Sequence, residues 1–169
     1  MKSLKFMRAT ATDREIEKFS LTVGDVIITK DSETPGDIAV PAYVDENLDG
    51  VVCGYHLAIL RPKKNKIARE FLSYLLSMAK TRYYFFTLAT GATRFGLSVG
   101  SIEKAHINLP STGEQKKISA VLRAADKEIE LLKRKRDCLV QEKKALMQQL
   151  LTGKRRVKLN GLAASERVA

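Results

Sequence analysis

The feature that most constrains this chain is a hydrophobic seam that begins at Ile118 and fills its last third. Seam positions recur at alternating steps of four and three residues, a 3.5-residue period maintained over more than four heptads. This period is typical of a helix that packs along another helix, rather than of a helix buried on a sheet. The seam positions are Ile118, Leu122, Ala125, Ile129, Leu132, Arg136, Leu139, Lys143, Leu146 and Leu150.

The seam predicts one long helix from Glu114 to Leu151, which Thr152-Gly153 would end. At about 1.5 Å per residue its length would be about 57 Å. A helix of this length can separate two domains or provide a long surface that binds partner proteins. We therefore divide the chain into a domain at 1–111, the coiled-coil helix at 112–153 and a basic, flexible tail at 154–169.

Two seam positions, Arg136 and Lys143, carry charges where apolar residues are usual. One interpretation is that these polar residues set the register of the helix pair and the choice of partner. The other is that the helices splay there, with the side-chain stems packed and the charges in water. A second apolar stripe, Val140 and Met147, fits either a third contact or a wider two-helix core.

The net charge of +11 is distributed unevenly along the chain. Residues 1–112 carry 15 Lys and Arg against 12 Asp and Glu, whereas residues 113–169 carry 15 against 7. Such an excess indicates a polyanionic partner, usually nucleic acid, although a solvated helix surface is the alternative. No apolar run is long enough to span a membrane. The two cysteines, Cys53 and Cys138, are expected to be reduced in a cytoplasmic protein.

The first 111 residues alternate short β-rich and helical segments, which predicts an α+β fold with a partial α/β domain before the long helix. Strands are expected at 26–29, 38–44, 51–60 and 105–109, with a loop at 31–37. A helical stretch capped by Thr12-Asp13 precedes them, and a longer helix is expected at 67–90.

No catalytic, metal or cofactor motif emerges from the sequence. His56 and His106 lack neighbouring Cys or carboxylate clusters, so structural roles are favoured over metal binding. Gly91 and Gly96 have the spacing of a P-loop, but Leu97 stands where a lysine must reach the phosphates. There is also no dinucleotide-type glycine motif to hold a cofactor.

Basic residues outside the helix are the candidates for DNA contact, because base edges and phosphates are bound mainly by Arg, Lys, Asn and Gln. Thr93 and Arg94 lie in a glycine-bounded loop that can bind a phosphate, or the loop is kept only for its turn. The candidate DNA-binding residues are Lys30, Arg61, Lys63, Lys64, Arg82, Thr93 and Arg94. An aromatic core edge is favoured over base stacking for Tyr83, Tyr84 and Phe86.

Several stretches together resemble a known family. They include the Leu21-x-x-Gly24-Asp25 strand start, the 91–97 loop with Gly91-x-Thr93, and Leu109-Pro110 before the long helix. The other matching stretches are 55–62, 70–76, 114–118 and 146–154. In their order and spacing they resemble the specificity (S) subunit of type I restriction–modification systems.

This resemblance implies a non-catalytic subunit, without a cofactor, that recognises double-stranded DNA and holds methyltransferase subunits. A full specificity subunit has two recognition domains and two spacer helices, so this chain resembles a half subunit. Its domain also lacks an opening segment, which suggests N-terminal truncation. We expect two copies to pair through the long helix. The alternative is a helix-mediated interaction module that has lost DNA specificity.

Overall fold

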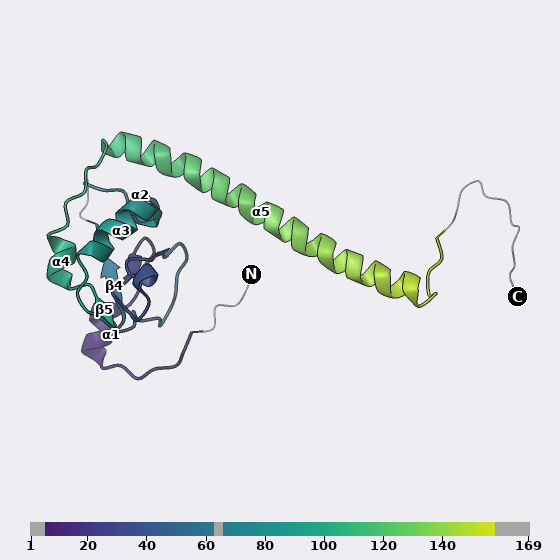
Figure 1. Ribbon diagram of the computed structural model, residues 1–169, viewed down its shortest axis with the longest axis horizontal. Coiled ribbons are helices and arrows are strands. Elements are labelled where there is room, and N and C mark those ends of the chain that lie inside the picture. Colours follow the sequence, from purple (N-terminus) through teal and green to yellow (C-terminus); the bar gives the residue numbers. More distant parts are fainter. Residues whose placement is uncertain (1–5, 63–65, 158–169) are drawn as a thin grey trace, which may run out of the picture. The chain divides into compact units, whose positions relative to one another are not determined.

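The computed structural model describes residues 6–62 and 66–157, and it has the α+β fold expected from the sequence (Figure 1). The chain divides into two compact units, 1–121 and 122–169, and the boundary falls within the last helix. The elements are α1 (Asp13–Phe19), β1 (Val26–Thr29), β2 (Asp31–Ser32), the 3-10 turn η1 (Pro35–Asp37), β3 (Pro41–Tyr43), β4 (Leu57–Leu60), α2 (Arg69–Ser77), α3 (Ala79–Thr87), β5 (Phe95–Gly96), α4 (Val99–Glu103) and α5 (Thr112–Leu151).

Strand β1 is the centre of a three-stranded antiparallel sheet with the order β3-β1-β4. Val26 pairs with Tyr43 on one side and Leu60 on the other, which fixes the register of all three strands. Because side chains alternate across a strand, Val26 and Ile28 point to the same face, and both are fully buried. The predicted strand at 26–29 is therefore confirmed.

A second, two-stranded sheet joins β2 to β5, with Asp31 opposite Gly96 and Ser32 opposite Phe95. A backbone hydrogen bond of 2.6 Å from Leu97 N to Lys30 O extends this pairing. The prediction of a simple loop at 31–37 was wrong, because two of its residues pair with residues that lie 63 and 65 positions away. Such a long-range pairing leaves no local hydrophobic signal. It brings the glycine-bounded loop at 91–98 against Asp31.

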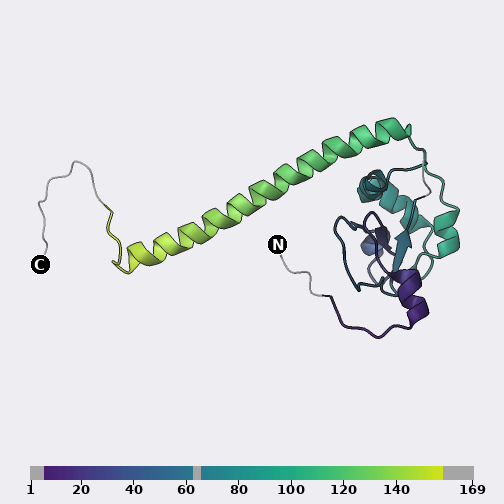
Figure 2. The same ribbon diagram turned by 180° about the vertical axis from the view of Figure 1, so that it is seen from behind.

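Helices α2 and α3 complete the core against the three-stranded sheet (Figures 1 and 2). The prediction of one helix at 67–90 was wrong, because the chain takes an extended conformation at Met78 and divides there. This break lets Leu76 of α2 and Phe85 of α3 enter the same core cluster. The core cluster consists of Val26, Ile28, Ile38, Ala39, Leu72, Leu76, Phe85 and Leu97.

Three predicted strands are shorter than expected or missing. The 38–44 strand keeps only Pro41–Tyr43, and the 51–60 strand keeps only Leu57–Leu60. Residues 105–109 form no strand within the described structure. Ala105 and Ile107 pack against the core, which accounts for their apolar pattern. The N–H of His106 donates to the Tyr84 hydroxyl at 3.2 Å, so a side chain replaces a neighbouring strand there.

Helix α5 is one uninterrupted helix of 40 residues, and its end at Leu151 agrees with the prediction. Gly153 takes a left-handed conformation (φ 72°) just beyond that end, and its N–H donates to the Leu150 carbonyl. The helix begins at Thr112, two residues before the predicted start. Of the predicted tail at 154–169, only residues 154–157 fall within the described structure.

Gln115 attaches the first turn of α5 to residues 66–110. Its side chain is fully buried, and its Oε1 accepts a hydrogen bond of 2.8 Å from the Ala68 N–H. Its Nε2 donates to the Pro110 carbonyl at 2.9 Å and to the Lys66 carbonyl at 3.2 Å. All three partners are backbone groups. Ser119, one turn later, is also buried and bonds back to the Gln115 carbonyl at 2.8 Å.

Candidate nucleic-acid interface

The structure separates the candidate DNA-binding residues into groups with different surroundings. Lys63 and Lys64 lie outside the described residues. Arg61 and Arg82 bind groups that hold the fold together. Lys30, Thr93 and Arg94 lie on or beside the β2–β5 sheet. A DNA role for each of them stays a prediction.

Arg61 forms a fork around the buried carboxylate of Asp25, which is only 1% exposed. Its Nε and Nη2 donate to the two carboxylate oxygens at 3.1 and 3.0 Å, and Nη2 also reaches the Ser20 carbonyl at 2.7 Å. Burial disfavours the charged carboxylate, but the hydrogen bonds from Arg61 and Thr22 outweigh it and lower the pKa of Asp25. These bonds tie the turn before β1 to the residue that follows β4.

Arg82 of α3 donates from Nη2 to the carbonyl of Gly36 in η1. Its Nε is buried and has no hydrogen-bond partner among the residues that the structure describes. The side chain therefore lies against η1 in this structure, with one polar atom shielded from water.

The loop between α3 and β5 forms a tight turn that requires glycine. Thr90 and Gly96 exchange two backbone hydrogen bonds of 2.9 and 2.8 Å across its base. Gly91 has a φ of 125°, and a Cβ at this position would collide with the Arg94 carbonyl. Leu97, which fills the lysine position of the rejected P-loop motif, is a buried core residue. The loop is built to project Arg94, which is exposed.

Arg94 meets side chains from two other segments in what we name the Asp31 cluster: Asp31, His56 and Arg94. The Arg94 Nε donates to Asp31 Oδ1 at 2.5 Å, and His56 Nδ1 lies 3.0 Å from Asp31 Oδ2. The Arg94 Nη2 lies 3.1 Å from the same His56 nitrogen. The hydrogen bonds from Arg94 and His56 lower the pKa of Asp31. Arg94 was predicted from the sequence as a candidate site residue, but Asp31 was not, because the proximity of the two depends on the β2–β5 pairing.

Lys30 and Tyr55 flank this cluster. The Lys30 Nζ lies 4.7 Å from the centre of the Tyr55 ring, within the range of a cation–π contact. The Tyr55 ring in turn meets His56 edge-on, with 5.4 Å between the ring centres. Tyr55 is 80% exposed, so this aromatic surface is open to a partner. His56, predicted to be structural, thus lies in the polar cluster with Arg94.

The seam of α5 is a second candidate interface, because its apolar side chains are exposed. Five seam residues, Leu122, Ile129, Leu132, Leu139 and Leu150, are between 39% and 59% exposed. Ala125 is exposed as well, while Ile118 and Leu146 are half-buried. Charged Arg136 lies beside its neighbour Asp137, with Nη2 2.7 Å from the Asp137 carboxylate.

The described residues include no helix long and apolar enough for a membrane span.

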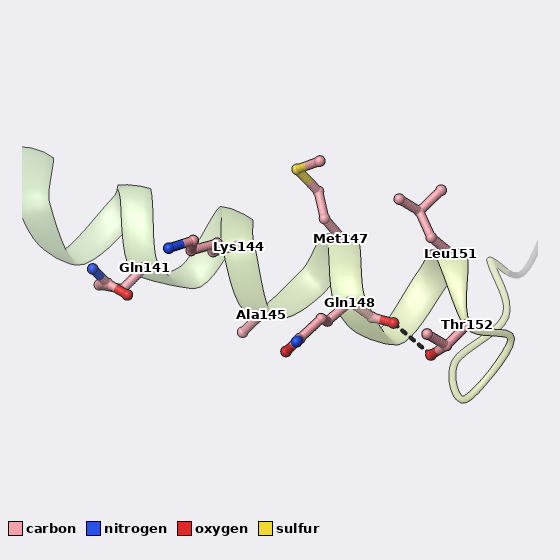
Figure 3. Close-up of a pocket in the computed structure, with 7 residues that line it drawn as sticks. All are labelled: Gln141, Lys144, Ala145, Met147, Gln148, Leu151 and Thr152. Atoms are coloured by element: carbon pink, nitrogen blue, oxygen red, sulfur yellow. Dashed lines mark hydrogen bonds between the residues drawn. The ribbon is translucent and has the colours of Figure 1, made fainter.

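Near its end α5 also carries a shallow apolar groove (Figure 3). Met147 and Leu151 point the same way from successive turns, while Ala145 and Gln148 lie on another side. The Thr152 hydroxyl donates to the Gln148 carbonyl, as the dashed line shows. Met147 belongs to the second apolar stripe noted in the sequence. This groove shows that the stripe continues to the last turn of the helix.

No group of three His, Cys, Asp or Glu side chains with a suitable arrangement for a metal ion occurs among residues 6–62 and 66–157. His56 pairs with Asp31, and both cysteines are free thiols. The described residues instead contain two small antiparallel sheets, an exposed Arg–Tyr–His surface and a long helix with an apolar seam.

Comparison with known proteins agrees with these features. A family model described as "Type I restriction modification DNA specificity domain" matches residues 11–141. The type I restriction enzyme MjaX specificity subunit of Methanocaldococcus jannaschii is 35% identical over 141 residues, which cover 82% of this chain. The MjaVIII specificity subunit of the same organism is 32% identical over 96 residues, or 57% of this chain.

The chain spans 32% of the length of the MjaX protein and 23% of the MjaVIII protein. Within the chain itself, the residues matched by the family model include the three-stranded sheet, the Asp31 cluster and most of α5. The match therefore covers most of residues 6–111 and the seam as far as Leu139 in one continuous segment. On this match the chain belongs to the type I restriction–modification DNA specificity domain family.

Proposed function

We propose that this chain is a DNA-recognition and scaffold subunit of a type I restriction–modification system. The family match across residues 11–141 is the observation that carries this proposal. In this role the chain contributes no catalytic group. Residues 6–111 read one DNA half-site, and α5 holds the methyltransferase subunits that modify it. We place this activity in the cytoplasm, where DNA and these partners meet.

The length of α5 fits the spacing that a two-part DNA site requires. Its 40 residues extend about 60 Å at about 1.5 Å per residue. Readers on successive turns of DNA are separated by about 34–36 Å or a multiple of it. A rigid helix pair can hold two readers at such a distance. The exposed seam supports pairing of two copies through Ile129, Leu132 and Leu139.

We further propose that the second stripe, Val140 and Met147, contacts a methyltransferase subunit. Both side chains are about half exposed, and Met147 lines the groove near the end of α5 (Figure 3). Methionine adapts to irregular partner surfaces because its side chain is flexible and polarizable. In this arrangement the seam serves the helix pair and the second stripe serves the enzyme subunit. Arg136 and Lys143 then restrict the register of the pair.

A second candidate function is an interaction module without DNA specificity. The observation that favours it is that Arg61 and Arg82 both donate to groups within the fold. Fewer cations are then available for DNA, while the seam of α5 keeps its docking capacity. The two functions differ in one measurable property, namely sequence-selective DNA binding.

The test is a selection of bound duplexes from a randomised DNA library by the purified chain, at several salt concentrations. Recognition predicts an enriched split motif, palindromic if two copies pair antiparallel, and an affinity that falls steeply with salt. Retention without any enriched motif would support the interaction module. Co-expression with the cognate methyltransferase subunit, in a host without N6-adenine methylation, should place methyl groups within the selected motif.

A further inference from the structure

The charges around the Asp31 cluster cancel, which bears on what it can bind. Arg94 lies beside two carboxylates, Asp31 and Glu33, and a second cation, Lys30, lies over the Tyr55 ring. A phosphate contact depends on net positive charge, because it replaces the counterions of the DNA backbone. Base edges in the major groove are neutral and present only hydrogen-bond donors, acceptors and methyl groups. The cluster therefore suits a base edge better than a phosphate.

The contacts within the cluster hold one edge of the Arg94 guanidinium and leave the other available. Asp31 and His56 engage Nε and Nη2, which lie on the same edge. The nearest carboxylate contact at the outer end is Glu33, whose Oε1 is 3.7 Å from Nη1 and beyond hydrogen-bond distance. The Arg94 side chain is 49% exposed. Its outer end thus keeps a pair of parallel N–H donors that can face a partner.

His56 fixes this arrangement in either of its neutral forms. With a proton on Nδ1 the ring donates to Asp31, and with the proton on Nε2 its Nδ1 accepts from Arg94. In both cases Asp31 stays bonded to the Arg94 Nε, and His56 Nδ1 adds one further hydrogen bond, to the carboxylate in the first form or from the guanidinium in the second. The Arg94 side chain is therefore already held in place before any ligand binds, so binding costs less side-chain conformational entropy.

These side-chain contacts are not needed to hold the surrounding backbone. The β2–β5 pairing and the Leu97 N–Lys30 O bond already join the two segments. The Asp25–Arg61 pair differs in this respect, because Asp25 is buried and Arg61 also bonds the Ser20 backbone. Asp31 keeps 20% of its side chain exposed, and its partners come from surface loops. An orienting role explains the cluster better than a structural one.

We propose that Arg94 reads a guanine in the major groove and that Asp31 and His56 are its positioning residues. The outer N–H pair of Arg94 would donate to the O6 and N7 acceptors of guanine, the commonest specific contact of arginine. The exposed ring of Tyr55 would lie against the neighbouring base step. This inference rests on the proposed function in DNA recognition and adds to it the base and the residues that select it.

The test repeats the library selection with the full chain and its Arg94→Lys, Asp31→Asn and His56→Gln variants. Glu130→Gln and Arg134→Lys are matched controls, because they alter an exposed carboxylate–arginine pair on α5. The expected result is a guanine at one motif position, preferred about tenfold or more by the unaltered chain. Arg94→Lys and Asp31→Asn should lose that preference, and Asp31→Glu should restore part of it. The other motif positions and the salt dependence should not change.

The outcomes separate this inference from the proposed function. If the unaltered chain selects a motif but the variants keep every preference, the inference is overturned and DNA recognition stands. A uniform rise in affinity of Asp31→Asn for all sequences would also overturn it, because that result identifies Arg94 as a phosphate contact restrained by Asp31. If the unaltered chain selects no motif, both fail. Amide exchange at Leu97 verifies that each variant keeps the β2–β5 pairing.

Discussion

Replacing Gln115 by leucine should loosen the attachment of α5 to residues 66–110. The substitution keeps most of the buried volume but removes the donor and the acceptor of the amide group. It leaves the Ala68 N–H and the Pro110 carbonyl without their partner, and also the Lys66 carbonyl, which belongs to a more exposed residue. Gln115 itself is fully buried, so water cannot simply replace its amide.

The size of the effect follows from the number of groups left unpaired. A buried polar group without a partner costs about 1–3 kcal/mol. Two such groups, less a gain of about 1 kcal/mol from the larger apolar surface of leucine, give a net loss of about 1–5 kcal/mol. At about 1.4 kcal/mol per factor of ten, this loss corresponds to an opening equilibrium about 5 to 4,000 times more favourable.

Amide hydrogen exchange measures this directly, because the Ala68 N–H is itself the donor to Gln115. Its exchange rate in Gln115→Leu should rise by the factor above, relative to the unaltered chain. The matched control is Gln149→Leu, which makes the same replacement at an exposed position of the same helix. If Ala68 exchanges equally slowly in both variants, the three hydrogen bonds do not hold the helix and the reasoning is refuted.

Three further predictions concern the seam, the buried carboxylate and the glycine turn. The double variant Leu132→Asp, Leu139→Asp should abolish self-association, measured as molecular mass by light scattering. The control variant Val121→Asp, Leu131→Asp changes residues off the seam and should keep the mass of the unaltered chain. An unchanged mass in the seam variant would contradict pairing through the seam. The pKa of Asp25 is lowered in the folded state, so the charged carboxylate stabilises the fold above its ordinary pKa of 3.8. This stabilisation is lost as the pH falls through the lower pKa of the folded state. Urea unfolding of Asp25→Asn should therefore show a weaker loss of stability in acid than the unaltered chain. Gly91→Ala should destabilise residues 6–121 by about 1–3 kcal/mol in thermal unfolding, since the new Cβ meets the Arg94 carbonyl. Gly50→Ala serves as a milder control, because Gly50 also has a positive φ (72°) but open space around it.

The long helix and the first strand could be predicted because their signals are local. The seam repeats within α5 itself, and Val26-Ile27-Ile28 is a β-branched run whose alternate residues are buried. The helical stretch at 3–20 was predicted in part: residues 6–12 are not helical, and the helix begins at Asp13, where Thr12 and Glu15 form a capping box with bonds of 3.3 and 2.9 Å.

The elements that could not be predicted depend on contacts between distant segments. The 105–109 stretch has the alternation of a strand, yet its apolar residues pack on the core and Tyr84 binds its backbone. The break at Met78 has no proline or glycine to mark it. The Asp31 cluster joins residues 31, 56 and 94, which meet only because β2 pairs with β5. A list of basic residues therefore included Arg94 together with Arg61, whose carboxylate partner is buried in the fold.

The joint at Gln115 has a consequence for how this protein can change. Its three hydrogen-bond partners are all main-chain groups, which every residue except proline at the donor position can supply. Substitutions on the surface loops near Asp31 and Tyr55 therefore leave the chemistry of the joint untouched. A chain could acquire a different surface around Asp31 and Tyr55 and still keep the same joint at Gln115. Substitutions in these loops and the attachment of α5 through Gln115 are therefore independent of each other in this molecule.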